Sequence, residues 1–401
     1  MLLLSTLFSN LTVLSLEQAL TAPYLTYRFV LDGMRVIRIE HPELGDPNRF
    51  VGDNVLGERG MCTYYLPYNV GKKAITLNLG LPEGRELLKE LIRKLKVDVF
   101  VTNQLPSRYV KLGIDYETLR SVKPDIIWVG ISGYGPENPE PAYDPTLQAR
   151  SGLMEITGDP GGDPMVIGVP LSDLGAAEHA YSEVMKALYK RALTGEGSRI
   201  DVSMFQSSVS WLITKLPHVK SFGKRISRTG NVHEFFAPVN VYPTKDGRYV
   251  YVAIGNDRQW EALTKLPGFE TLARKEYRTN AGRIADVKNL NVKMVAITRT
   301  KTLNELISMF NSAGIPVAKI NTLEEVCEDP LIRDLMIRSE DPKTKVKLYL
   351  PPPPVVSPYL KSVGFKLSFP PRMGEHNEEI YVNLLGISKE KFEELKSKGV
   401  I

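Results

Sequence analysis

A near-continuous apolar run, IIWVGIS at residues 126–132, most constrains the fold of this chain. A strand with apolar side chains on both faces must be covered on both sides, as in a parallel sheet between helical layers. Similar strand-like segments occur at 11–16, 35–40 and 97–102, and helical patterns separate them. This alternation predicts an α/β fold with a parallel sheet.

The helical patterns have recognisable starts. Pro23 opens one helical stretch, and Pro82 opens a second whose apolar residues share one face. A third, short helix is expected at 116–122, and a long one at 175–193. Alternating apolar residues at 200–204 then predict a further strand.

The pattern changes after about residue 205. Segments 239–242 and 249–254 flank a Lys-Asp-Gly turn, which indicates a β-hairpin. Two capping boxes, at 302–305 and 322–325, predict helix starts. A chain of 401 residues is long enough for two cores, so we expect a second, small α+β domain.

Composition excludes several classes of protein. The net charge of +5 is spread along the chain without a long basic run, which favours a polyanionic small molecule over nucleic acid as partner. Cys62 and Cys327 lack metal-ligand spacing, so we expect no metal, no disulfide and a reducing, cytoplasmic environment. No dinucleotide fingerprint is present, so no nicotinamide cofactor is expected. Nothing reaches transmembrane length, and no Lys or Arg precedes Arg28, so we interpret the apolar residues 1–16 as neither membrane anchor nor signal peptide.

Asp173 is the main candidate for chemistry. It lies where a loop enters the long predicted helix, and the residues after it are small, so a substrate can approach it. The helix dipole favours the ionised form of a carboxyl group at this position. The alternative interpretation is that Asp173 caps the helix and satisfies free N–H groups.

Other polar residues have two interpretations each. Arg38, Lys72 and Lys73 form a group of cations that can hold phosphates or remain a solvated surface. Tyr143 can pack or donate a hydrogen bond, while Asp144 can cap the helix that follows it.

Three further side chains have a structural role as one interpretation. His179 lies six residues beyond Asp173, too far to act as its base, so we interpret it as structural. Arg150 and Arg228 are candidate partners for a second substrate carboxylate, with a surface or structural role as the alternative.

These segments occur in the order and spacing of a known family. The chain resembles the class III CoA-transferase family, which includes formyl-CoA transferase, carnitine CoA-transferase and α-methylacyl-CoA racemase. The matching motifs include Ala22-Pro23-Tyr24, Gly45-Asp46-Pro47, Leu112-Gly113-Ile114-Asp115-Tyr116, Tyr143-Asp144, Asp173, Thr194-Gly195-Glu196-Gly197, Ala313-Gly314-Ile315-Pro316 and Gly374-Glu375-His376-Asn377.

The resemblance implies an architecture. It predicts a Rossmann-like large domain with a parallel sheet, a small α+β domain, and a homodimer of interlocked rings. The large domain begins at 1–205, a linker follows at 206–232, and the small domain occupies 233–325. Residues 326–401 return as a linker and as the C-terminal part of the large domain.

The resemblance also implies a site. Asp173 attacks an acyl-CoA thioester and carries covalent intermediates while CoA passes to a small carboxylic acid. Arg38, Lys72, Lys73 and Asn103 match positions near the CoA phosphates. The substrate-pocket candidates are Leu20, Tyr143, Asp144 and Gly175. Leu105 stands where the family has an Arg that helps hold CoA, and Leu20 stands where formyl-CoA transferase has a Gln, which makes formyl or oxalyl substrates doubtful.

Two other functions remain open. An α-methylacyl-CoA racemase needs two acid/base groups at the α-carbon, and racemase-like members place a His before the Asp at position 144. Tyr143 occupies that place here, and an unperturbed Tyr, with a pKa near ~10, is a poor base at neutral pH. A CoA-binding protein without activity is the third possibility; retention of Asp173 argues against it.

Overall fold

The computed structural model describes residues 7–401. Residues 1–6, part of the segment that we interpret as neither signal peptide nor anchor, lie outside the described residues. The chain forms two compact units. The first comprises Met1–Leu153, Ile167–Lys220 and Leu331–Ile401, and the second comprises Met154–Val166 and Ser221–Pro330.

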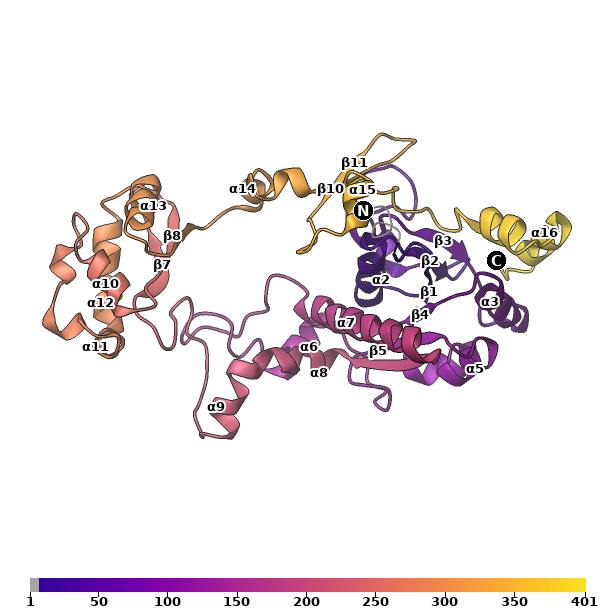
Figure 1. Cartoon of the computed structure of the whole chain (residues 1–401), viewed down its shortest axis with the longest axis horizontal. Coiled ribbons are helices and arrows are strands. Elements are labelled where there is room, and N and C mark those ends of the chain that lie inside the picture. Colours follow the sequence, from indigo (N-terminus) through magenta and orange to yellow (C-terminus); the bar gives the residue numbers. More distant parts are fainter. Residues whose placement is uncertain (1–6) are drawn as a thin grey trace. The chain divides into compact units, whose positions relative to one another are not determined.

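A six-stranded sheet forms the centre of the first unit (Figure 1). Its order is β3-β2-β1-β4-β5-β6, and every neighbouring pair is parallel. The strands are β1 (Thr12–Leu16), β2 (Arg35–Glu40), β3 (Lys73–Thr76), β4 (Val99–Thr102), β5 (Ile127–Ser132) and β6 (Ser198–Ser203). The chain runs outward from β1 to β3, then returns to β4 on the other side of β1, so the strand order reverses between β1 and β4. The α/β class with a parallel sheet is therefore confirmed.

Helices cover both faces of this sheet, because alternate residues of each strand point to opposite sides. Val13 belongs to the core formed with helices α2 (Thr21–Leu31) and α7 (Leu171–Thr194), whereas Leu14 belongs to the core formed with α3 (Pro82–Lys94) and the C-terminal segment. The helices of the unit are α2 (Thr21–Leu31), α3 (Pro82–Lys94), α4 (Tyr109–Leu112), α5 (Tyr116–Val122), α6 (Asp144–Ser151), α7 (Leu171–Thr194), α8 (Met204–Ser210), α9 (Leu216–Lys220), α15 (Pro358–Ser362) and α16 (Lys389–Ser397).

The C-terminal segment completes this unit. Helix α16 and the π-helical segment Glu378–Leu384 pack beside α3, as the yellow and indigo ribbons show in Figure 1. Lys94 Nζ donates a hydrogen bond to the carbonyl oxygen of Leu385 at 2.7 Å. A two-stranded hairpin, β10 (Ile337–Glu340) and β11 (Lys347–Leu350), precedes this segment.

The structure differs from the sequence predictions at two places. Strand β3 was not predicted, because its four residues follow a turn and begin with a lysine. Helix α7 begins at Leu171, four residues before the predicted start, so Asp173 lies inside its first turn.

The second unit has its own core. Strands β7 (Val239–Pro243), β8 (Tyr249–Ala253) and β9 (Val317–Lys319) form an antiparallel sheet. Its helices are α10 (Asp257–Leu263), α11 (Asn280–Ala285), α12 (Val287–Thr298), α13 (Leu303–Ser312) and α14 (Leu323–Cys327). Both predicted capping boxes are present, at Thr302 and Thr322. Residues 154–166, expected in the large domain, cluster with this unit.

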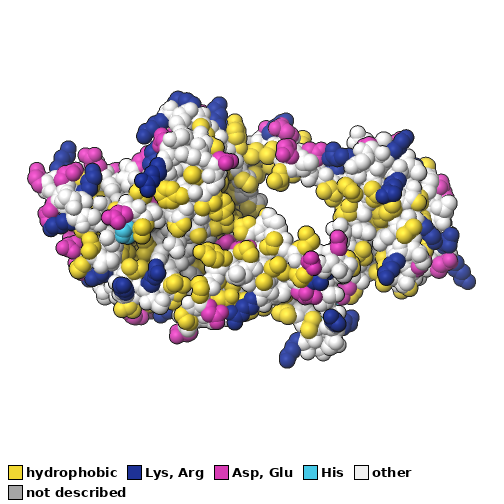
Figure 2. Space-filling view, turned by 180° about the vertical axis from the view of Figure 1, so that it is seen from behind, with side chains coloured by type: hydrophobic (Ala, Val, Ile, Leu, Met, Phe, Trp, Pro, Cys, Tyr) yellow, Lys and Arg dark blue, Asp and Glu magenta, His cyan; other side chains and the backbone are white. Residues whose placement is uncertain are grey.

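The surface is mixed in charge. On the face shown in Figure 2, Lys and Arg side chains alternate with Asp and Glu and do not gather in one patch. Within residues 7–401, no helix combines the length and apolar character that a membrane span requires.

Candidate active site

Two neighbouring cavities open at the carboxyl ends of the parallel strands, on either side of the point where the strand order reverses. Open α/β sheets bind ligands at such a point, because the loops that follow the strands separate there. The larger cavity measures about 410 Å³ and the smaller about 290 Å³. They share Gln18, Gln104 and Arg108, so they adjoin one another.

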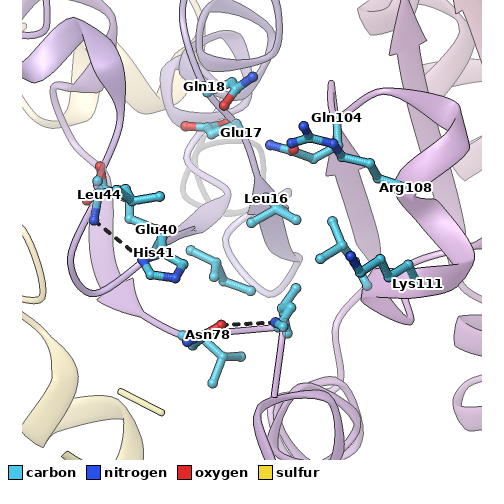
Figure 3. A pocket seen from close by; sticks show the side chains of 16 residues that line it. Leu16, Glu17, Gln18, Glu40, His41, Leu44, Asn78, Gln104, Arg108 and Lys111 are labelled. Atoms are coloured by element: carbon cyan, nitrogen blue, oxygen red, sulfur yellow. Dashed lines mark hydrogen bonds between the residues drawn. The ribbon is translucent and has the colours of Figure 1, made fainter. Parts of the chain in front are cut away.

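The larger cavity has basic side chains on opposite walls. Figure 3 shows His41 and Leu44 on one side and Arg108 and Lys111 on the other. His41 Nδ1 accepts the backbone N–H of Glu43 at 3.2 Å, which leaves the ring proton of the neutral form on Nε2. The Arg108 and Lys111 side chains are exposed and form no ion pair within the part of the chain that the structure describes.

Arg38 and Lys72 do not reach either cavity. They lie in a buried network of three cations and three carboxylates: Arg38, Arg49, Lys72, Glu17, Glu40 and Asp46. Arg38 is 0% and Lys72 1% exposed. Arg38 pairs with Asp46 at 2.7 Å, and Lys72 pairs with Glu17 at 2.8 Å. Because protein carboxylates neutralise both charges, we revise the expectation that these two side chains contact phosphates: they pair with Glu40 and Glu17, which line the larger cavity.

The network also holds the loop that follows β1. Asp46 accepts the backbone N–H of Ala19 at 3.2 Å, and Ala19 has the left-handed φ of 59° that non-glycine residues rarely adopt. Asn103 lies beside the same loop: its amide donates to the Gln18 carbonyl at 2.8 Å and accepts the Gln18 N–H at 3.0 Å. Asn103 lines the smaller cavity, so its predicted contact with CoA stays a prediction.

Asp173 lines the smaller cavity from the first turn of α7. Its Oδ1 accepts a short hydrogen bond from the Thr21 hydroxyl, at the start of α2. Its carboxylate does not cap its own helix. The two N–H groups that a cap would satisfy, those of Ser172 and Asp173, donate to Asp144 Oδ1 at 2.6 and 3.3 Å.

Asp144 therefore caps α7, and not the helix α6 in whose first position it lies. Gln148, one turn further along α6, donates to Asp144 Oδ2 at 2.7 Å, and its Oε1 accepts the N–H of Ile167 at 2.9 Å. Both side chains are buried. This pair, which we call the Asp144–Gln148 clamp, fastens the residues before and at the start of α7. It thereby leaves the Asp173 carboxylate available for a substrate.

The pKa of Asp173 is raised, whereas the helix dipole alone would lower it. Burial raises the pKa of Asp173 to about 6, the Thr21 hydrogen bond acts in the opposite direction, and the charge of Asp144 acts in the same direction as burial. At pH 7 such a group is still about nine-tenths ionised. Asp173 is thus a carboxylate at neutral pH but a more basic one than an exposed aspartate, which strengthens it as a nucleophile.

The remaining predicted site residues lie in different places. Tyr143 lines the Asp173 cavity and is 76% exposed. Leu20 lines a separate apolar cavity. Gly175 lines neither cavity of the site: it faces Trp211, and a Cβ there would lie 2.7 Å from Trp211 Nε1, so its small size serves helix packing. Lys73 pairs with Glu379 outside both cavities.

Several residues of the site are not recognisable from the sequence. Thr21, Gln148, Arg108 and Lys111 carry no motif that marks them as functional. Arg108 and Lys111 follow β4, and the rule that ligands bind beyond the carboxyl ends of parallel strands provides a signal for them. His179 has the structural role predicted, since it stacks on Trp211 and its Nδ1 lies 2.8 Å from Ser207 Oγ.

Comparisons with known proteins show the family to which this chain belongs. The family model described as CoA-transferase family III matches residues 8–377. The human succinyl-CoA:glutarate CoA-transferase is 32% identical over 97% of this chain and 88% of its own length. The acetyl-CoA:oxalate CoA-transferase of Acetobacter aceti is 33% identical over 83% of this chain and 86% of its own length. The succinyl-CoA:mesaconate CoA-transferase of Haloarcula marismortui is 32% identical over 82% of this chain and 84% of its own length.

Solved structures show the same fold. A CaiB/BaiF family protein from Brucella suis superposes with a TM-score of 0.80 at 30% identity, over 93% of this chain and 98% of that one. A Mycobacterium tuberculosis protein superposes with a TM-score of 0.78 at 23% identity, over 92% of this chain and 97% of that one. The family match spans most of the chain, and relatives above 30% identity cover most of it, so the protein is an enzyme of CoA-transferase family III.

Proposed function

We propose that this protein moves CoA from an acyl-CoA to a small carboxylic acid through covalent intermediates on Asp173. The observation that carries the proposal is that the Asp173 carboxylate is not used as a helix cap: Asp144 caps α7 in its place, and Asp173 lines a cavity at the switch point of the sheet. Covalent transfer needs a nucleophile that a thioester can reach, and this arrangement supplies one.

The exchange proceeds in four balanced steps. The Asp173 carboxylate attacks the thioester carbonyl, CoA leaves as thiolate, and a mixed anhydride forms. The thiolate attacks the Asp173 carbonyl of the anhydride, which releases the first acid and leaves an aspartyl-CoA thioester. The acceptor carboxylate then attacks this thioester and forms a second anhydride, releasing CoA thiolate. Attack of the thiolate on the acceptor's carbonyl yields the new acyl-CoA and frees Asp173.

The larger cavity is the proposed place of CoA. Lys111 and His41 stand on opposite walls and supply N–H donors suited to phosphate oxygens. The adjoining Asp173 cavity then receives the thioester. The relatives are named for succinyl-CoA, glutarate, oxalate and mesaconate, which carry two carboxylates when free, and we propose acids of this class for this enzyme.

Two observations favour transfer over racemisation. Proton transfer at an α-carbon needs a second acid/base group besides Asp173. No histidine occurs among the described residues that line the Asp173 cavity. Two other described carboxylates line that cavity, and both are engaged: Asp144 accepts three hydrogen bonds, and Glu140 pairs with Arg150.

Mass spectrometry of the protein after incubation with succinyl-CoA tests the proposal. We expect a covalent adduct on the peptide that contains Asp173, converted to a hydroxamate by hydroxylamine, and no adduct in Asp173→Asn. The Asp163→Asn variant, changed at an exposed aspartate, serves as control and should retain the adduct. Exchange of α-hydrogens in deuterated water without any adduct would favour the racemase and refute the transferase.

The quaternary structure and the location of the protein belong to the same proposal. An interlocked homodimer is supported by the family resemblance. A cytoplasmic location is supported by the two free cysteines, Cys62 and Cys327.

A further inference from the structure

Among the described residues, Arg108 is the one cation at the junction of the two cavities. Of the residues common to both linings, Gln18 and Gln104 are neutral. Lys111 and His41 line the larger cavity alone. Among the described residues that line the Asp173 cavity, Arg108 is the single positively charged side chain.

Among the described residues, the three glutamates that line the two cavities are already paired. Glu140 pairs with Arg150 at 2.6 Å, Glu17 with Lys72 at 2.8 Å, and Glu40 with Arg49 at 2.6 Å. Arg150 was a candidate partner for a second substrate carboxylate, but its guanidinium is already paired with Glu140.

Arg228, the other candidate partner for a second substrate carboxylate, is also paired. Arg228 pairs with Glu155 at 2.8 Å. By contrast, the exposed guanidinium of Arg108 has no ion-pair or hydrogen-bond partner within residues 7–401. It is therefore available to an anion that enters from solution.

We infer that Arg108 binds an oxyanion of the substrate at this junction, and that this oxyanion is the free carboxylate of a dicarboxylic acyl group. A guanidinium presents two parallel N–H donors that match the two oxygens of a carboxylate. Arg108 lines the cavity of the nucleophile, whereas Lys111 and His41 do not, which assigns the phosphates to them and the acyl carboxylate to Arg108. The inference rests on the proposed function and makes Arg108 its specificity-determining residue.

Two thioesters of equal chain length test this assignment. Succinyl-CoA and butyryl-CoA both carry four-carbon acyl groups, but only the first has a free carboxylate. We expect Arg108→Gln to lower kcat/KM for succinyl-CoA by about 10- to 100-fold, the range for loss of a charge-assisted hydrogen bond. The value for butyryl-CoA should change less than about twofold, and Arg108→Lys should recover part of the loss because it keeps the charge. Arg120→Gln, an exposed change on α5 outside both cavities, should change neither value.

Other outcomes would contradict the assignment of Arg108 in distinguishable ways. An equal loss for both thioesters, absent with the corresponding pantetheine thioesters, would mean that Arg108 binds a CoA phosphate and would overturn the carboxylate assignment. Unchanged kinetics for both would overturn the inference altogether. Failure of the proposed function differs from either, because the unmodified protein would then form no Asp173 adduct with any thioester.

Discussion

Asp173 combines a reactive position with an energetic cost. Its carboxylate accepts a hydrogen bond from Thr21, yet burial and the charge of Asp144 raise its pKa to about 6. A folded-state pKa above that of the unfolded chain means that the ionised group destabilises the fold. This cost is absent below about pH 4, grows as the pH rises towards 6, and is constant above.

Asp173→Asn should therefore make the protein more stable while abolishing transfer. At pH 7.5 we expect the free energy of unfolding to rise by about 1–3 kcal/mol, because a neutral amide has no ionisation cost and still accepts the Thr21 hydrogen bond. The gain should disappear at pH 4, where the native carboxyl is protonated. Denaturant unfolding at both pH values measures the difference. A variant less stable than the parent at pH 7.5 would contradict the assigned environment.

Asp144→Asn tests the electrostatic coupling between the two carboxyl groups. The amide oxygen can keep the hydrogen bonds from Ser172 and Asp173, while the negative charge that raises the pKa of Asp173 is removed. In the parent, the rate of CoA release in the first half-reaction should fall as the pH drops through about 6, since only the ionised Asp173 attacks. The midpoint should move to lower pH in the variant. An unchanged or higher midpoint would show that Asp144 does not influence the nucleophile.

At the scale of elements, α6 positions the start of α7. The Asp144–Gln148 clamp binds the N–H groups of Ile167, Ser172 and Asp173 across two helices. Gln148 donates to a carboxylate and accepts from the backbone, so both ends of its buried amide are satisfied.

Gln148→Ala should loosen this arrangement. We expect kcat to fall by roughly tenfold, on the order of one lost charge-assisted hydrogen bond, with little change in the KM for acyl-CoA. Single-turnover kinetics separate the two effects. Gln206→Ala, an exposed glutamine on α8, is the matched control and should leave both constants unchanged. A loss confined to KM would place Gln148 in substrate binding and not in positioning Asp173.

These elements also show which features of the fold can be predicted from local sequence patterns. The runs at 35–40 and 126–132 predicted strands β2 and β5 to within a residue, because apolar periodicity is a local property. The start of α7 was misplaced because its cap comes from another helix: Asp144 lies 28 residues before Ser172, and no local pattern announces it. Arg38 was expected near phosphate because its strand position is visible in the sequence, whereas its neutralisation by Asp46 and Glu40 is not.

At the scale of the whole molecule, the proposed homodimer has a direct test. The chain mass is 44.9 kDa, so a dimer should elute with twice that mass, about 90 kDa, in size-exclusion chromatography with light scattering. Interlocked rings cannot separate without unfolding or breaking a ring, so the mass should not fall on dilution to nanomolar concentration. A species of single-chain mass at any concentration that retains native structure would contradict the interlocked arrangement.

Local patterns were enough to predict the α/β class and the hairpin of the second unit and to select Asp173 as the candidate, because periodicity, turn residues and motif order are encoded in neighbouring residues. Local patterns do not show which charged side chains face the cavities, because this depends on the tertiary structure. It buried Lys72 against Glu17, 55 residues away, and left Arg108 and Lys111 exposed at the cavities. It also brings Asp144 to the N-terminus of α7, where Asp144 caps the helix, so that the Asp173 carboxylate is not needed as a cap. The physical reason is that the state of a charged side chain depends on its burial and its partners, and long-range packing brings those partners together.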